Sequence, residues 1–135
     1  MRYLVTGGAG FIGSNFIRFL LDERPDAHVV NLDALSYAGN LENLVEVMDN
    51  VRHTFIHGDI SDPNTVTSAI EGVDIVINLA AETHVDRSIQ ADSQFLQTNV
   101  IGAATLLDGA LKAGVKRFVQ VSTDEVYGEL PWVDP

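Results

Sequence analysis

The sequence predicts an α/β fold built on a doubly wound parallel sheet, and three observations predict it. Apolar runs of strand length alternate with helical patterns along the whole chain, as in sheets whose strands are joined by crossover helices. The run at residues 74–79 is nearly continuous in apolar residues, which is typical of a strand covered on both faces. A glycine-rich turn at residues 7–13 joins the first strand pattern to the first helical pattern.

The elements follow from apolar runs for strands and from one-sided apolar faces for helices. Asp62 can cap a helix whose first position suits Pro63, and Gly72 and Gly114 are expected to end the helices before them. In chain order the sequence predicts a strand at 3–5, a helix at 16–21, a strand at 28–32, a short helix at 41–48, a strand at 51–57, a helix at 62–70, a strand at 74–79, a long helix at 91–113 and a strand at 116–122.

Composition limits the classes of function. The 135 residues, 46% of them hydrophobic, suffice for one domain with a real core. The absence of cysteine excludes disulfides and cysteine-based metal sites or nucleophiles. A formal net charge of −11 argues against nucleic acid and anionic membranes as partners. Such a surface suits a high-salt cytoplasm or an ordinary acidic protein, and composition leaves both open.

No apolar stretch is long enough to span a bilayer, and the chain opens directly into its first strand pattern without a secretory signal. A nucleotide cofactor, which the motifs below indicate, points to the cytoplasm. We therefore expect a cytoplasmic protein with no membrane and no nucleic-acid partner.

The glycine-rich turn is expected to hold a phosphate group. Gly7 allows the tight turn, Gly10 lets the backbone approach a pyrophosphate, and Gly13 lets the helix pack closely. The helix start then presents free N–H groups to the anion. Asp33, at the end of the second strand pattern, stands where a carboxylate accepts hydrogen bonds from the ribose of adenosine. It would repel a 2′-phosphate, so the turn predicts a Rossmann domain that binds NAD rather than NADP.

A second informative stretch follows the last strand pattern. Thr123 is followed by the adjacent acids Asp124 and Glu125. Neighbouring carboxylates repel, so one can stay protonated near neutral pH. A protonated acid beside an ionised one is the pair that eliminates water, because one protonates the leaving hydroxyl and the other takes a C–H proton. A solvated acidic turn remains the alternative interpretation of these residues alone.

Motifs spread over nearly the whole chain resemble the extended short-chain dehydrogenase/reductases, the family of NAD-dependent epimerases and dehydratases. Among these, the sequence is most similar to the dTDP-glucose 4,6-dehydratases, because related sugar epimerases carry small or uncharged residues in place of Asp124 and Glu125. The matching segments are residues 7–15, 35–40, 58–60, 80–88, 98–102 and 122–128.

The resemblance implies a nucleotide-sugar 4,6-dehydratase with NAD as its cofactor and no metal. It implies transient oxidation at C4 of the sugar with Thr123 bonded to that hydroxyl. Glu125 then removes the C5 proton and Asp124 protonates the departing C6 hydroxyl. Thr83, like Thr123, would touch the sugar nucleotide, and His84, Asp86 and Arg87 would shape the site. The implied cofactor-binding residues are Gly7, Gly10, Phe11, Ile12, Gly13, Asp33, Ala34, Ser36, Asp59, Ile60, Leu79, Ala80, Ala81, Thr83 and Thr98.

One family feature is missing from these residues. The family oxidises C4 with a Tyr-x-x-x-Lys pair, but Tyr3, Tyr37 and Tyr127 are each followed four residues later by a residue other than lysine. Residues 1–135 are therefore expected to be the amino-terminal part of the NAD-binding domain. On this interpretation the chain is truncated before the last strands and the substrate domain, inactive by itself, and homodimeric when full length. The alternatives are a nucleotide-sugar 4-epimerase and a non-catalytic NAD-binding module.

Overall fold

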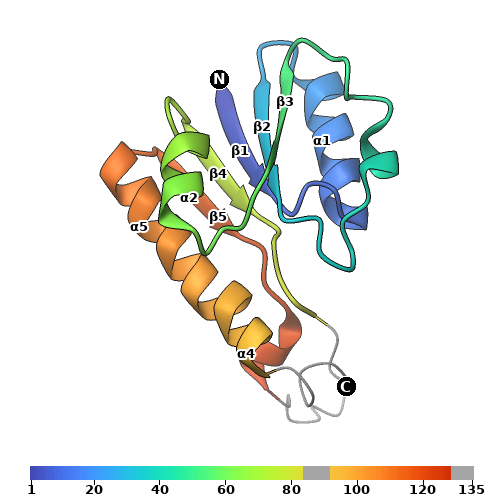
Figure 1. Ribbon diagram of the computed structural model, residues 1–135. Helices are drawn as coiled ribbons and strands as arrows, with labels where there is room; N and C mark the ends of the chain where they lie inside the picture. The colour runs from blue at the N-terminus through green and yellow to red at the C-terminus, as the bar shows by residue number, and fades with distance from the viewer. Residues whose placement is uncertain (84–91, 129–135) are drawn as a thin grey trace, which may run out of the picture.

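The computed structural model describes residues 1–83 and 92–128 and shows one parallel sheet (Figure 1). The strand order is β3-β2-β1-β4-β5, and every neighbouring pair is parallel. Chain order reverses at β1, which lies between β2 and β4, and this switch point is where open α/β sheets bind ligands. The strands are β1 (Arg2–Thr6), β2 (His28–Asp33), β3 (His53–His57), β4 (Ile75–Asn78) and β5 (Arg117–Gln120).

Helices cover both faces of this sheet (Figure 1). Helix α1 and the 3₁₀ turn η1 share one apolar core with the sheet, and α2 and α5 share the other. The predicted doubly wound fold is therefore confirmed for the described residues. The helical segments are α1 (Phe11–Glu23), η1 (Leu41–Leu44), α2 (Pro63–Ala69), α4 (Asp92–Phe95), the π-helix η2 (Leu96–Gly102), α5 (Ala103–Ala113) and the 3₁₀ helix η3 (Asp124–Tyr127).

Strand β1 shows why the apolar runs are continuous. Leu4 belongs to the core under α2 and α5, whereas its neighbour Val5 belongs to the core under α1. Both side chains are fully buried, because successive residues of a strand point to opposite faces. Each buried side chain of this size stabilises the fold by about 1.5–3 kcal/mol.

Two helix ends form as the sequence predicts. The Asp62 carboxylate accepts the N–H groups of Asn64 at 3.1 Å and Thr65 at 3.2 Å, and Pro63 occupies the first helical position. These bonds, led by the one from the Thr65 hydroxyl, hold the pKa of Asp62 below its ordinary value. Gly114 ends α5 in the left-handed conformation, with φ of 69°.

Three predicted elements differ from the structure. The helix predicted at 41–48 is wrong beyond one 3₁₀ turn, η1, since a short segment gains little from helix formation. The long helix predicted at 91–113 contains the π-helix η2 within its described part. The predicted fifth strand, at 116–122, ends at Gln120, where the chain leaves the sheet.

Strand β5 lies at the edge of the described sheet and pairs there only with β4. Its burial is low, because only Phe118 of its side chains packs against a core. The sequence predicts a central position for this strand in a complete sheet but an uncovered edge within residues 1–135, and the described sheet has it at the edge.

Buried His53 of β3 makes the stability of the fold depend on pH. Burial lowers the pKa of its imidazole below the ordinary 6.5, so the unfolded chain binds more protons than the folded chain below that pH. The free energy of unfolding should therefore be highest above pH 6.5 and fall as the pH drops below it. His53→Gln should flatten this slope, measured by urea unfolding between pH 8 and 5. An unchanged slope in the variant would assign the pH dependence to other groups.

Candidate functional site

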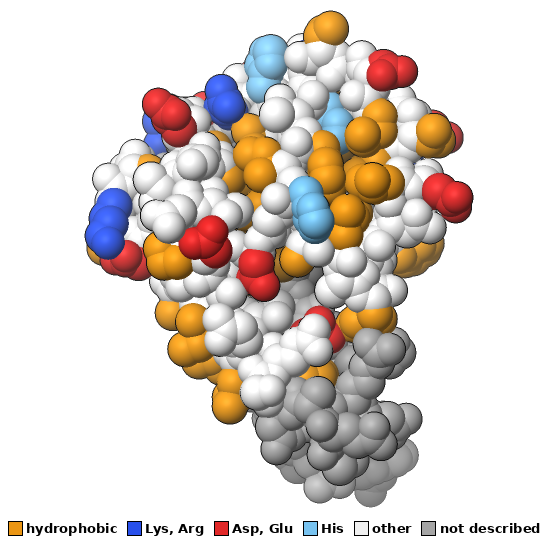
Figure 2. All heavy atoms as spheres, in the orientation of Figure 1, with side chains coloured by type: hydrophobic (Ala, Val, Ile, Leu, Met, Phe, Trp, Pro, Cys, Tyr) orange, Lys and Arg blue, Asp and Glu red, His pale blue; other side chains and the backbone are white. Residues whose placement is uncertain are grey.

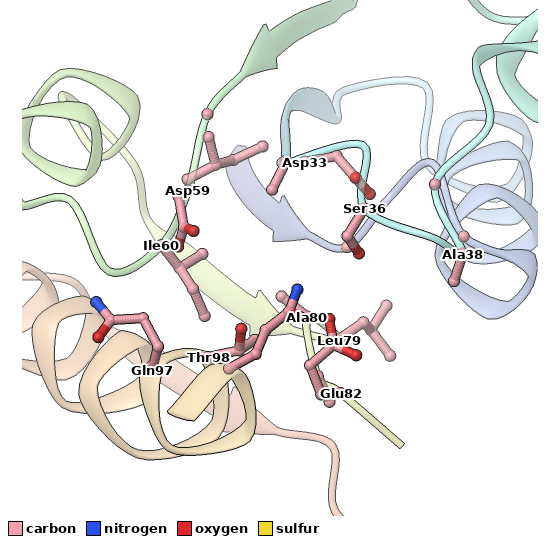
Figure 3. A pocket seen from close by; sticks show the side chains of 18 residues that line it. Asp33, Ser36, Ala38, Asp59, Ile60, Leu79, Ala80, Glu82, Gln97 and Thr98 are labelled. Carbon is pink, nitrogen blue, oxygen red and sulfur yellow. The ribbon is translucent and has the colours of Figure 1, made fainter. Parts of the chain in front are cut away.

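A groove opens at the carboxyl ends of the strands, around the switch point at β1. Figure 3 shows its labelled side chains in a ring around an open space, with Asp33 and Ser36 facing Ile60 and Gln97 across it. The groove is lined by Gly7, Gly10, Leu32, Asp33, Ala34, Ser36, Ala38, Gly39, Gly58, Asp59, Ile60, Leu79, Ala80, Ala81, Glu82, Gln94, Gln97 and Thr98.

The glycine-rich loop forms one wall of this groove. Gly7 has φ of 69°, and a Cβ there would lie 2.7 Å from the backbone nitrogen of Ala80. A Cβ on Gly13 would lie 2.2 Å from the carbonyl oxygen of Gly7. Each glycine is therefore required by close backbone packing, Gly7 against the end of β4 and Gly13 within its own loop.

Gly10 leads into α1 without any capping side chain. Its backbone is extended, and no side chain accepts a hydrogen bond at this helix start. The helix therefore lacks the side-chain acceptor that ordinarily bonds its first N–H groups. A Cβ on Gly10 would meet nothing closer than the Gly7 carbonyl oxygen, at 3.3 Å. This end of α1 fits an anionic group that would itself accept those N–H groups.

Asp33 joins this loop to the end of β2. One of its carboxylate oxygens accepts the Ala9 N–H at 2.8 Å, and the other accepts the Leu35 N–H at 2.7 Å. The side chain is 7% exposed and lines the groove. A carboxylate has about four acceptor positions, so two remain for hydroxyl groups of a ligand.

The backbone after Asp33 is strained at Leu35. Leu35 has φ of 51°, an unusual value for a residue with a branched side chain. Its side chain packs against the core under α1. A Cβ on Gly39 would lie 2.7 Å from an Asp33 carboxylate oxygen, so this loop also needs a glycine to close on the carboxylate.

The opposite wall of the groove comes from the end of β3 and from the π-helix. Asp59 begins this segment and accepts the Ser61 N–H at 2.8 Å, while Ile60 is buried. A Cβ on Gly102 would lie 2.6 Å from Ile60, so the glycine allows the helix to approach. Gln97 and Thr98 project from η2 into the groove (Figure 3). Such π-helical turns are frequent at functional sites.

A second hollow lies beside the groove, over the ends of β4 and β5. It shares Ala80, Ala81 and Glu82 with the groove and extends to Thr83, Ser122 and Thr123. The two hollows form one continuous lining along the carboxyl edge. The Asn99 side chain fixes their junction, because it accepts the Glu82 N–H and donates to the Glu82 carbonyl oxygen, each at 2.9 Å.

The residues predicted for catalysis start at this second hollow. Thr123 is exposed and lines it, and the backbone of Asp124 and Glu125 lies in η3. The side chains of these two acids, and His84, Asp86 and Arg87, lie outside the described residues. Thr83 lines the second hollow, where its hydroxyl oxygen lies 3.3 Å from that of Tyr37.

The structure brings most of the predicted cofactor residues to one groove. Thr83 lies in the adjoining hollow, and Gly13 is buried behind Gly7, while Phe11 and Ile12 are exposed at the start of α1. The predicted residues that line the groove are Gly7, Gly10, Asp33, Ala34, Ser36, Asp59, Ile60, Leu79, Ala80, Ala81 and Thr98.

Sequence reasoning missed several residues of the site. Gly8 is required because a Cβ there would lie 2.0 Å from the side-chain oxygen of Asn31, and Gly39 is required by Asp33. Gln97 and Glu82 also line the groove. The helical pattern around Gln97 gave no signal of the π-turn, whereas Gly8 and Gly39 stand inside segments that the sequence analysis had already selected.

Two features are absent from the described ranges, 1–83 and 92–128. These ranges contain no group of three or more His, Asp or Glu side chains arranged to hold a metal ion. They also contain no helix with the length and hydropathy needed to cross a membrane.

A family model for GDP-mannose 4,6 dehydratase matches residues 4–134. The chain belongs to the GDP-mannose 4,6 dehydratase family. Its curated relatives include the low-salt glycan biosynthesis protein Agl12 of Haloferax volcanii, which is 55% identical over 130 residues covering 96% of this chain and 42% of the relative.

Solved structures of dehydratases and epimerases share the fold of this family member. DesIV, a dTDP-glucose 4,6-dehydratase from Streptomyces venezuelae solved with NAD and TYD bound, superposes with a TM-score of 0.92 at 52% identity, over 98% of this chain and 42% of DesIV. A UDP-glucose 4-epimerase from Thermotoga maritima with UDP-glucose gives 0.86 at 36% identity, over 100% of this chain and 42% of the epimerase. The chain thus spans about two fifths of the length of these proteins.

The close contact between Gly8 and Asn31 predicts that alanine destabilises the fold at Gly8 but not at Gly10. Gly8→Ala should lower the free energy of unfolding by about 1–3 kcal/mol through overpacking. Gly10→Ala should leave stability near wild type, since its nearest contact is 3.3 Å. Asn31→Ala in the Gly8→Ala background should restore part of the loss, because the clashing side chain is gone. Urea unfolding measures all three, and equal stability of the two single variants would contradict the packing argument.

Proposed function

We propose that this chain is the NAD-binding part of a nucleotide-sugar 4,6-dehydratase that converts dTDP-glucose to its 4-keto-6-deoxy product. The observation that carries the proposal is a groove at the uncapped start of α1 and Asp33 that continues into a hollow lined by Thr123, the residue before Asp124 and Glu125. The likeness to DesIV at 52% identity supports it. Residues 1–135 form the amino-terminal portion of that NAD-binding Rossmann domain.

The residues present fit NAD. The uncapped start of α1 fits its pyrophosphate, because no side chain accepts its first N–H groups and Gly10, which lines the groove, has no Cβ. Asp33 keeps acceptor positions for the adenosine ribose and repels a 2′-phosphate. Asp59 and Ile60 are proposed to contact the adenine ring of NAD. The remaining cofactor residues are proposed as Gly7, Phe11, Ile12, Gly13, Ala34, Ser36, Leu79, Ala80, Ala81, Thr83 and Thr98.

NAD, when bound, would supply the acceptor of the C4 hydride and, once reduced, the donor of the hydride to C6. The chain's own residues handle the protons of the elimination, whereas the C4 hydroxyl proton needs the tyrosine of a Tyr-x-x-x-Lys pair, which residues 1–135 lack. The Thr123 hydroxyl holds the C4 hydroxyl group in place, and Thr83 contacts the sugar nucleotide. The 4-keto group acidifies the C5–H bond, so the Glu125 carboxylate can take that proton. Asp124 donates a proton to the C6 hydroxyl, whose C–O bond breaks to release water.

A nucleotide-sugar 4-epimerase is the second candidate, because the solved 4-epimerase structure also superposes closely. The adjacent acids after Thr123 favour the dehydratase, since epimerisation at C4 needs no group that eliminates water. A non-catalytic NAD-binding module is the third candidate. Product analysis separates them: a 4-keto-6-deoxy sugar supports the dehydratase, a C4 epimer supports the epimerase, and NAD binding without turnover supports the module.

The protein is further proposed to be cytoplasmic, to act without a metal ion, and to avoid nucleic acid and membranes because of its net charge of −11. A homodimer is proposed for the full-length protein. Its support is the exposed apolar surface along η2 and α5, whose outer side carries apolar side chains in Figure 2. The exposed members are Leu96, Val100, Leu107 and Leu111.

Asp33 predicts the cofactor preference. NAD should bind more tightly than NADP, and Asp33→Ala should narrow the ratio of the two affinities by roughly tenfold, the equivalent of one interaction of about 1.4 kcal/mol. Asp59→Ala is the matched control, a groove carboxylate whose loss should weaken both cofactors alike. Titration calorimetry measures the affinities. If Asp33→Ala keeps the wild-type preference for NAD over NADP, Asp33 does not bind the adenosine ribose.

The role proposed for Glu125 predicts that its variant separates loss of the C5 proton from oxidation at C4. Glu125→Gln should block exchange of the C5 proton with deuterated solvent by about two to four decades in rate. Oxidation at C4 should partly persist, because the amide keeps the shape of the side chain. Asp124→Asn should retain C5 exchange but fail to release water. Normal C5 exchange in Glu125→Gln would reject it as the base.

The 135 residues by themselves are proposed to be inactive. None of their tyrosines, Tyr3, Tyr37 and Tyr127, is followed by lysine at the fourth position, so these residues lack a tyrosine–lysine pair for the C4 oxidation. The isolated chain should give no 4-keto product from dTDP-glucose, measured by mass spectrometry. Turnover by the isolated chain would disprove the requirement for that pair.

A further inference from the structure

Three polar side chains lie side by side at the carboxyl ends of neighbouring strands. Thr6 of β1 is paired in register with Asn78 of β4, and Asn78 with Gln120 of β5. They share the sheet face that carries the core under α2 and α5. Two residues earlier on the same strands, that face carries the apolar residues Leu4, Val76 and Phe118. The change from apolar to polar therefore occurs in all three strands at the same level.

These side chains form one hydrogen-bonded chain across the sheet. The Ala80 N–H donates to the Thr6 hydroxyl oxygen at 3.3 Å, and that hydroxyl donates to the Asn78 side-chain oxygen. The Asn78 amide donates to the Gln120 side-chain oxygen at 2.8 Å, and the Gln120 amide donates to the Val121 carbonyl at 3.0 Å. The chain runs from the wall of the cofactor groove to the segment that leads into Thr123.

Burial makes these bonds consequential. Thr6 is fully buried and Asn78 is 1% exposed, whereas Gln120 is exposed at the edge of the described sheet. Buried amides and hydroxyls must be paired, because an unpaired one costs about 1–3 kcal/mol. Gln120 accepts from the buried Asn78 amide and so satisfies one of its donors. The polar trio has the geometry to fix the backbone at Ala80 and Val121, where the chain leaves the sheet.

The end of β5 depends on these bonds. Beyond Gln120 the last backbone bond to β4 is the one from the Val121 N–H to the Asn78 carbonyl, at 3.1 Å. The Gln120 side chain holds the Val121 carbonyl from the other side of that residue. Because Ser122 and Thr123 follow at once and are exposed, their direction is set by how Val121 is held.

We propose that Gln120, supported by Asn78, is a positioning residue that fixes the direction of the segment carrying Thr123. The proposal rests on the function proposed above, in which the Thr123 hydroxyl holds the sugar. Gln120 is exposed and, like Asn78, lines the second hollow, and the role proposed for it is exerted through its bond to Val121. Its loss should lower turnover by roughly ten- to a hundredfold, the cost of a small misplacement of a catalytic group.

Two variants of Gln120 distinguish its bond to Val121 from its bond to Asn78. Gln120→Met keeps the length of the side chain and removes both bonds. Gln120→Glu keeps the oxygen that accepts from Asn78 but cannot donate to the Val121 carbonyl. Both should lower kcat in the whole protein while KM for the nucleotide sugar and the bound NAD content stay near wild type. If only Gln120→Met is impaired, the bond to Val121 is not the one that matters and the proposal fails.

A double-mutant cycle with Thr123→Val connects the effect to the proposed target. In the Thr123→Val background, Gln120→Met should have little further effect on kcat, because the hydroxyl that it positions is already absent. Multiplicative losses in kcat would overturn the proposal, as would an unchanged kcat in Gln120→Met.

Amide hydrogen exchange gives a readout that is independent of turnover. The Val121 amide should lose protection in Gln120→Met, while amides of α5 such as Ala110 keep theirs. Unchanged protection at Val121 would overturn the positioning role even in an active enzyme. A wild-type protein without turnover would instead remove the proposed function, and the exchange result would still decide whether Gln120 fixes the segment.

Discussion

The site depends on the Asp33 carboxylate, which holds the loops after β1 and β2 together. One oxygen accepts the Ala9 N–H and the other accepts the Leu35 N–H, at 2.8 and 2.7 Å. The bonds join the glycine-rich loop to the end of β2, and Leu35, which donates one of them, has a left-handed backbone. Because the carboxylate is buried, charge-assisted bonds of this kind are stronger than neutral ones. The same side chain lines the groove, so the residue that holds these loops together also faces the space in which we propose that the cofactor binds.

Close approach of backbone segments follows from this arrangement. Gly7 packs on the end of β4, Gly8 on Asn31, Gly13 on the Gly7 carbonyl and Gly39 on Asp33. The carboxyl edge of the sheet is therefore made of backbone held at contact distance, and the first N–H groups of α1 have no side-chain acceptor there. The residues proposed for catalysis start outside this part, at the hollow over β4 and β5, where Thr6, Asn78 and Gln120 form a hydrogen-bonded chain.

Much of the fold was predictable because its signals are local. Asp62 with Pro63 specified the start of α2, Gly114 specified the end of α5, and continuous apolar runs specified strands covered on both faces. Predictions failed where the outcome depended on distant contacts. The segment after Asn40 has apolar residues at helical spacing but forms only η1, and Gly102 must pack on Ile60, a contact that the sequence near the helix does not contain.

The sequence by itself determined the class of fold, the family and the residue types of the site, because the glycine turn, Asp33 and the Thr-Asp-Glu segment are local patterns with few structural explanations. Tertiary structure alone decided which of those residues share one groove, that Gln97 and Glu82 join them, and that Gly8 and Gly39 are needed. It also decided that Thr6, Asn78 and Gln120 form one hydrogen-bonded chain. These features arise between segments up to 114 residues apart, Thr6 to Gln120, and register between strands is set by the packed sheet rather than by neighbours in sequence.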